Sequence, residues 1–290
     1  MATDTTTSAN MNMHESSLAS SHMHTNTHAD TDTHEAELRI AQLRDSIFGV
    51  IFGHALGDSM GVVTQYSGRR AQFPYAEPIC DNIAINYWSD MTEELISTLN
   101  KAKIDNTPHG GEPSMDVNNI NINNISIAPI IESNYAFMDT ITDATLQIHY
   151  NFIANIIRGL STPDEVNHLL MTSVRGRSAT MDTWAKTSYT QAIGNLDSTQ
   201  SIMYSMWALQ IIKKSLIYQK KPNFRKILLL VADQRGSSVV NCALVGSIIG
   251  GHIGYSNLPK KLLTAMPDHD WLYSQIEEYL DEKTTLSVVN

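Results

Sequence analysis

Two apolar segments of this sequence carry glycine at every fourth position, and this spacing constrains the fold more than any other feature. The first lies in "GVIFGHALGDSMG" and the second in "VVNCALVGSIIGGHIGY", and their glycines are Gly49, Gly53, Gly57, Gly61, Gly246, Gly250 and Gly254. Glycine inside a helix costs about 1 kcal/mol relative to alanine, so a row of glycines indicates that another backbone must come very close. We therefore predict two buried helices that pack on one another and bring the two ends of the folded body together.

The chain between these segments is predominantly helical in pattern. Apolar residues at helical spacing predict further helices at roughly 92–103, 136–159, 163–173, 198–218, 223–232 and 270–281. Residues 104–131 are rich in asparagine and isoleucine and contain glycine and proline, which predicts a long loop or insertion. Its Ile/Asn alternation would also suit a short strand, but no sheet is visible for it to join. We expect one all-α domain, a helical bundle over residues 39–290.

Residues 1–38 differ in composition from the rest. They are rich in threonine, serine, asparagine and histidine and have almost no large aliphatic side chains. Such a segment cannot bury enough apolar surface to offset its ordering entropy, so we predict a disordered low-complexity tail. Its histidines would bind a transition metal at most loosely.

Charge and cysteine content exclude several classes of function. The formal net charge of -10 argues against a nucleic-acid or anionic-membrane surface. The apolar run from Val239 contains Asn241 and His252 and is too short for a membrane span. Cys80 and Cys242 are too few for a disulfide framework, and the N-terminus has no secretory pattern. We expect reduced thiols and a cytoplasmic location.

The stretch "WSDMTEEL" (88–95) admits two interpretations. Three of the four residues after Trp88 carry oxygen, as a hard metal ion requires, but the fourth is Met91, whose thioether is a poor ligand for magnesium. Alternatively, Ser89 caps a helix and Thr92 or Glu93 completes the cap. Asp58, in the first glycine segment, would likewise cap a helix or hold a turn.

Three stretches, in order, resemble the ADP-ribosylglycohydrolase family, which includes the dinitrogenase reductase-activating glycohydrolases. They are "GVIFGHALGDSMGVVTQ", "WSDMTEEL" and "FRKILLLVADQRGSSVVNCALVGSIIGGHIGYSNLP", and the likeness covers roughly residues 40–282. The resemblance implies an all-α fold, two bound magnesium ions (manganese in some members) and hydrolysis of the bond joining ADP-ribose to a modified side chain.

The resemblance also implies which residues stand at the metal-ligand positions. In the second stretch these positions hold Ser89, Asp90 and Met91. In the third they hold Ser237, Val239 and Val240. One carboxylate and two hydroxyls therefore remain, and Met91, Val239 and Val240 stand where ligands are lost.

The resemblance also covers three positions outside the metal-ligand set, of which one is changed and two match. Gln65 falls where many members place a glutamate near the scissile bond, so Gln65 and Asp90 are the candidate catalytic residues. Asp58 and Gly236 match the pattern and are candidates for ligand binding. Glutamine binds a substrate or water by hydrogen bonds but cannot act as a general base.

The number of carboxylates at the metal-ligand positions decides between the functions that remain possible. Two divalent cations in a partly buried cleft require several anionic oxygens, and one carboxylate falls well short. We therefore expect a family member that has lost most of the magnesium site and binds an ADP-ribose-like ligand or a protein partner, or serves a structural role, as the crystallins of jellyfish lenses that resemble the family do. The alternative is an active hydrolase that uses one metal at Asp90 to release ADP-ribose. A third class is a helical interaction protein unrelated to ADP-ribose.

Overall fold

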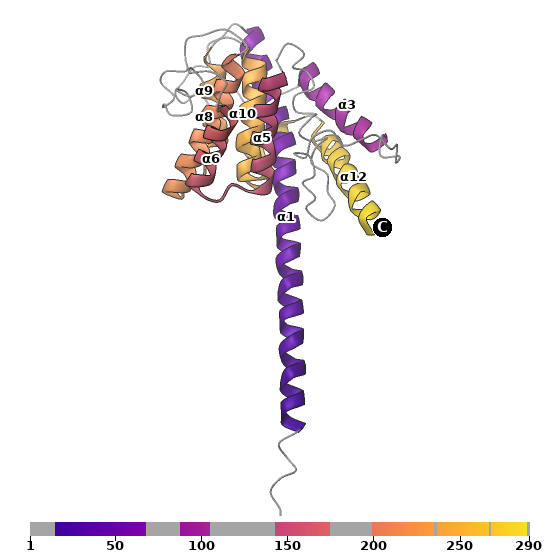
Figure 1. Ribbon diagram of the computed structural model, residues 1–290. Coiled ribbons are helices and arrows are strands. Elements are labelled where there is room, and N and C mark those ends of the chain that lie inside the picture. Colours follow the sequence, from indigo (N-terminus) through magenta and orange to yellow (C-terminus); the bar gives the residue numbers. More distant parts are fainter. Residues whose placement is uncertain are drawn as a thin grey trace, which may run out of the picture. The chain divides into compact units, whose positions relative to one another are not determined.

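The computed structural model describes residues 15–67, 88–104, 143–174, 199–234, 237–266 and 268–288. Over these ranges every regular element is a helix, in agreement with the all-α prediction (Figure 1). The predicted loop after Ile104, the candidate residue Gly236 and the first part of the predicted tail lie outside the described residues. Contacts divide the chain into two units, Met1–Gln42 and Leu43–Asn290.

The helices follow one another as the apolar spacing predicts. Their bounds are α1 Glu15–Ser67, α3 Asp90–Ile104, α5 Asp143–Arg158, α6 Pro163–Val174, α8 Thr199–Tyr218, α9 Phe224–Ala232, α10 Ser238–Ile253, the 3-10 helix η2 Tyr255–Asn257, α11 Lys260–Ala265 and α12 His269–Val288. The short elements η2 and α11 were not predicted, because so few residues show no clear period.

Helix α1 includes part of the predicted tail. The disorder that the sequence predicts over residues 1–38 stays a prediction, while α1 extends from Glu15 to Ser67. Adding a residue to an existing helix gains one hydrogen bond, while a new helix must first form a costly nucleus, so a segment of weak propensity can continue a stable helix. Leu38 is 49% exposed and Leu43 only 3%, so Leu43 is the first buried core residue among those described.

The glycine rows of α1 and α10 face one another, as predicted. A β-carbon placed on Gly53 would collide with the carbonyl oxygen of Gly246, and one on Gly246 would collide with that of Gly53. At the end of the row, a β-carbon on Gly61 would lie 2.5 Å from the Cα of Val239. The two helices therefore touch backbone to backbone along several turns, and we call this contact the glycine seam.

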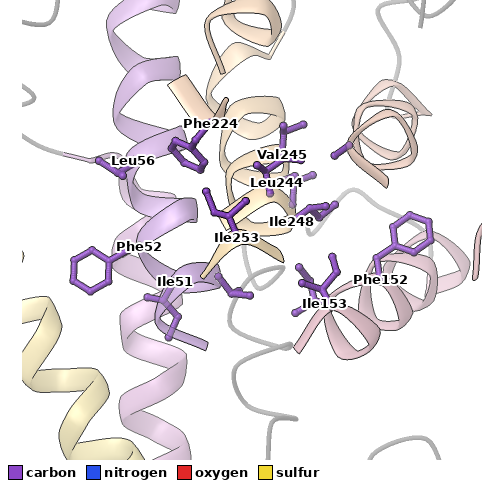
Figure 2. Close-up of a cluster of buried hydrophobic side chains, with 14 of the residues drawn as sticks. Ile51, Phe52, Leu56, Phe152, Ile153, Phe224, Leu244, Val245, Ile248 and Ile253 are labelled. Carbon is purple, nitrogen blue, oxygen red and sulfur yellow. The ribbon is translucent and has the colours of Figure 1, made fainter. Parts of the chain in front are cut away.

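Helix α10 is the centre of the second unit. Almost all of its side chains are buried, and it packs against α5, α8 and α9 as well as α1. Figure 2 shows part of the core, with Phe52 on α1, Phe152 on α5, Phe224 on α9 and Ile248 on α10. Full burial of such a side chain stabilises the fold by about 1.5–3 kcal/mol.

One stretch of α1, Glu37–Thr64, is long and apolar enough to cross a bilayer, among the residues that were searched. Most of this stretch is buried against the other helices of the chain. Its apolar character is therefore accounted for by its place in the core.

Candidate functional site

Asp58 links the first glycine segment to the stretch "WSDMTEEL". Its side chain is fully buried on α1, and Oδ2 accepts hydrogen bonds from the backbone N–H of Ser89 (3.0 Å) and Thr92 (3.3 Å) and from the Thr92 hydroxyl (2.6 Å). These donors belong to the start of α3, whose first backbone N–H groups have no partner within the helix. Asp58 therefore caps α3 from a separate helix, one of the two structural roles expected for it.

The buried carboxylate of Asp58 also shapes the electrostatics around it. Burial raises the pKa of Asp58, and the hydrogen bonds from Thr92 and Ser89 oppose that rise. Burial and then the charge of Asp58 raise the pKa of the Cys242 thiol on α10. Asp58 therefore lies close to α10 as well as to α3. Its Oδ1 atom is buried and has no hydrogen-bond partner among the described residues.

A small apolar cluster joins the same three helices. Its buried members are Val62 of α1, Met91 of α3 and Val239 and Ala243 of α10, and the half-buried Val240 packs against them. Met91 and Val239 are 8% and 7% exposed. We call these five residues the apolar corner. Met91 and Val239, which the family resemblance implies stand at separate metal-ligand positions, thus belong to one cluster and are packed with hydrocarbon.

The oxygen-bearing residues at the remaining ligand positions lie at the edge of the corner. The Ser89 hydroxyl accepts a hydrogen bond from the Met91 N–H (3.2 Å), so it caps α3 as the alternative interpretation of "WSDMTEEL" predicts. Asp90 is exposed at the first position of α3. Ser237 is exposed at the N-cap of α10 and makes no side-chain cap bond there.

The two other candidates are not tested by this geometry. Gln65 belongs to the last turn of α1, but the structure does not describe its side chain, and Gly236 is outside the described residues. Their roles stay predictions.

Sequence reasoning did not identify Val62 as part of this site, nor Thr92 as a partner of Asp58. Val62 follows Asp58 by one helical turn, so both face the same side of α1. This four-residue spacing could have identified Val62 as a neighbour of Asp58 from the sequence. Thr92 was considered only as part of a local cap. Its hydroxyl instead makes the shortest of the bonds to Asp58, from a position far along the chain.

Comparison with known proteins agrees with this fold. A family model described as ADP-ribosylglycohydrolase matches residues 140–287, about half of the chain. The chain belongs to the ADP-ribosylglycohydrolase family. A solved structure titled "ADP-ribosylglycohydrolase-related protein complex" is similar in fold, with a TM-score of 0.53 and 13% sequence identity over 84% of this chain and 99% of that one. No curated protein matches the chain.

The residues present do not fit the pair of magnesium ions that the family resemblance implies. Magnesium requires near-octahedral oxygen ligands, and a charge placed against buried hydrocarbon loses its hydration without compensation. The apolar corner offers a thioether and alkyl groups at Met91 and Val239, and the Ser89 hydroxyl is already a helix cap. Among the residues described, no group of three or more His, Cys, Asp or Glu side chains is arranged to hold a metal ion.

The buried charge of Asp58 predicts a pH effect on stability. Burial raises the pKa of Asp58 in the folded state, so the folded protein holds the Asp58 proton more tightly than the unfolded chain does. This protonation stabilises the fold fully below the unfolded pKa of about 3.9, and the stabilisation is lost as pH rises through the folded pKa. Asp58→Asn keeps an oxygen to accept the three hydrogen bonds but never ionises. We expect the free energy of unfolding of Asp58→Asn, relative to wild type, to increase as pH rises from 4 to 7.

Urea unfolding of both proteins at several pH values measures this difference. The Asp90→Asn variant is the control for loss of an acidic side chain, because Asp90 is exposed rather than buried. A difference for Asp58→Asn that stays constant or falls with rising pH would contradict the assignment.

Proposed function

We propose that this chain is a non-catalytic member of the ADP-ribosylglycohydrolase family that binds an ADP-ribosyl group in the cytoplasm without cleaving it through a metal pair. The single observation that supports the loss of catalysis is the packing of Met91 with Val239 in the apolar corner. The choice of ligand is supported by family membership alone.

The physical argument concerns what occupies the ligand positions. A neutral, exposed site that merely lacked carboxylates could still admit a hydrated cation. Here the Met91 and Val239 side chains are almost completely buried and in contact with Val62 and Ala243. Placing a divalent ion there requires separating apolar side chains and dehydrating the ion at the same time, and both steps are unfavourable.

A second candidate is favoured by one feature, the carboxylate of Asp90. Asp90 is exposed, and among the described residues no hydrogen bond or ion pair engages it. A single magnesium ion held by Asp90 and water would make the chain a weak hydrolase. Glu93 and Glu94 are also exposed and follow Asp90 by three and four residues, so they lie on the same face of α3, but among the described residues these acids do not form a group that could hold a metal ion.

Magnesium at millimolar concentration is expected to leave the melting temperature of the protein unchanged. A ligand present at 100 times its dissociation constant would add about 2.7 kcal/mol, which corresponds to a rise of roughly 5 to 10 °C for a domain of this size. Thermal unfolding with magnesium and with a chelator, for wild type and Asp90→Ala, measures the effect. A rise that Asp90→Ala abolishes would favour the single-metal hydrolase.

Calorimetric titration with ADP-ribose, together with mass spectrometry of an ADP-ribosylated arginine peptide, tests the ligand and the lack of cleavage. The proposal expects binding of ADP-ribose and an intact peptide after incubation with magnesium. Cleavage of the peptide would overturn the non-catalytic assignment, whereas absence of binding would overturn the choice of ligand.

A further inference from the structure

The most basic segment of this acidic chain lies at the junction of α8 and α9. Residues 213–226, "KKSLIYQKKPNFRK", contain six cations and no acid, although the whole chain has a net charge of -10. We propose that this junction is a docking surface for an acidic peptide segment of a partner protein. We call it the basic patch: Lys213, Lys214, Ile217, Tyr218, Lys220, Lys221, Arg225 and Lys226. This inference goes beyond the proposed function and does not depend on it.

The fold brings these charges to one end of two helices. Lys213 and Lys214 lie near the end of α8, Lys220 and Lys221 lie in the short connection, and Lys226 lies in the first turn of α9. Because the connection is short, the end of α8 and the start of α9 are close in space. The six cations therefore form one region of positive potential.

The positive charge of the patch is not neutralised by its described neighbours. Lys213 donates to the side-chain oxygen of Asn167, and Lys221 donates to that of Asn257, each at 2.6 Å, and both acceptors are uncharged amides. Lys214, Lys220 and Lys226 are exposed and form no hydrogen bond or ion pair through their side chains with any described residue.

The stabilising effect of cations at a helix C-terminus explains the positions of only some of these six cations. Lysines near the end of α8 interact favourably with the partial negative charge of a helix C-terminus. Arg225 and Lys226, however, lie in the first turn of α9, where the helix dipole already presents partial positive charge. Asn223 accepts the Lys226 N–H at 3.0 Å, so that end of the helix is capped without them. In addition, the Nε atom of Arg225 is buried without a hydrogen-bond partner among the described residues.

Apolar side chains stand between the cations. Ile217 is 51% exposed and Tyr218 is 75% exposed, which makes Tyr218 the most exposed of the large apolar side chains described. Tyrosine supplies contact area at low entropy cost and is enriched where proteins bind one another. A partner segment that carries both carboxylates and a leucine or phenylalanine would complement the charge and the apolar surface together.

The surrounding charge favours a short peptide over a larger polyanion. A nucleic acid or an anionic membrane would extend beyond the patch and meet a molecule whose net charge is strongly negative. The acids Asp164 and Glu165 start α6, near the Asn167 that binds Lys213, and Glu165 is bonded to the N–H groups of Ser161 and Thr162. A short peptide is affected mainly by the patch itself, because charges are screened beyond about 8 Å at physiological salt.

The basic patch is separate from the apolar corner. Helix α9 begins at the patch with Phe224 and ends at Ala232, a few residues before Ser237. A helix of this length spans about 13 Å. The basic patch therefore lies about one length of α9 away from the start of α10, where Val239 and Val240 belong to the apolar corner.

Fluorescence anisotropy of the full chain with a labelled peptide tests the proposal. The probe alternates pairs of glutamate with single leucines, and a peptide with lysine in place of glutamate is the matched control. We expect saturable binding of the acidic probe that weakens as salt increases, and no binding of the basic peptide. Lys214→Gln, Lys220→Gln and Lys226→Gln together should weaken binding about tenfold, since each exposed ion pair contributes modestly. Tyr218→Ser should weaken it at constant charge.

Arg39→Gln is the control for net charge, because Arg39 is an exposed cation on α1 that is not part of the basic patch and pairs with Glu35. It is compared with Lys220→Gln alone, and only Lys220→Gln should weaken binding. Equal effects of the two variants, or no saturable binding of the acidic probe, would overturn the proposal. So would tighter binding to single-stranded DNA or to phosphatidylserine vesicles than to the peptide. Circular dichroism of each variant confirms that the helices are intact.

Discussion

Gly53→Ala is expected to destabilise the protein by about 3 kcal/mol or more, because the added methyl group collides with backbone rather than with a movable side chain. At this point of the glycine seam a β-carbon would overlap the carbonyl oxygen of Gly246 and lie 2.9 Å from the carbonyl carbon. Relief requires α1 and α10 to separate, which opens the most buried part of the core. Urea unfolding monitored by circular dichroism measures the loss.

Gly159→Ala is the matched control for this substitution. Gly159 follows α5 with a φ of 91°, and a β-carbon there meets nothing within 4 Å. The alanine therefore introduces only backbone strain, which costs about 1–2 kcal/mol. Equal losses for the two variants would show that α1 and α10 do not approach as closely as the seam requires.

Restoring the lost ligands together is expected to create a magnesium site that the wild type lacks. The variant combines Met91→Asp, Ser237→Asp and Val239→Asp with Val240→Thr and Gln65→Glu. If the fold is that of the family and only the ligands changed, the added carboxylates share a cation and offset one another's repulsion. Calorimetric titration of magnesium into wild type and variant measures the gain, and hydrolysis of an ADP-ribosylated peptide is a separate readout.

Single restorations are expected to be harmful. Met91→Asp alone places a carboxylate among Val62, Val239 and Ala243 and near the buried Asp58, without a cation. A buried unpaired charge of this kind costs about 3–5 kcal/mol unless it takes up a proton. A combined variant that binds magnesium no better than wild type would mean that the residue correspondence is wrong.

The sequence predicted those features whose cause lies in the residue itself or within a few neighbours. The glycine rows predicted the contact of α1 with α10, because only the absence of a side chain permits it. Pro163 and the preceding Thr162 predicted the start of α6, and Thr162 and Glu165 do exchange hydrogen bonds there. Helix periodicity predicted α3, α8 and α9 to within two residues, whereas α12 continues to Val288, seven residues past its predicted end, and the predicted start of α5 at residue 136 lies outside the described residues.

Features that depend on distant partners could not be predicted in the same way. Whether Asp58 capped a helix or held a turn was open, because its donors Ser89 and Thr92 come from a different helix. Met91 and Val239 were recognised as lost ligands only through the family resemblance. Nothing in either local sequence indicated that both would pack on Val62, since packing partners are set by the tertiary fold.

The glycine seam has a consequence for how the chain is made. Gly61 of α1 contacts Ser238 and Val239, which are encoded about 180 residues later. At a synthesis rate of roughly 5–20 residues per second, the apolar face of α1 waits on the order of 10 to 35 s before α10 has been translated. During that interval the apolar stretch Glu37–Thr64 lacks the helix that covers it in the folded protein. Because apolar surface that stays uncovered during synthesis promotes aggregation, we expect a chaperone that binds α1 to increase the yield of folded protein.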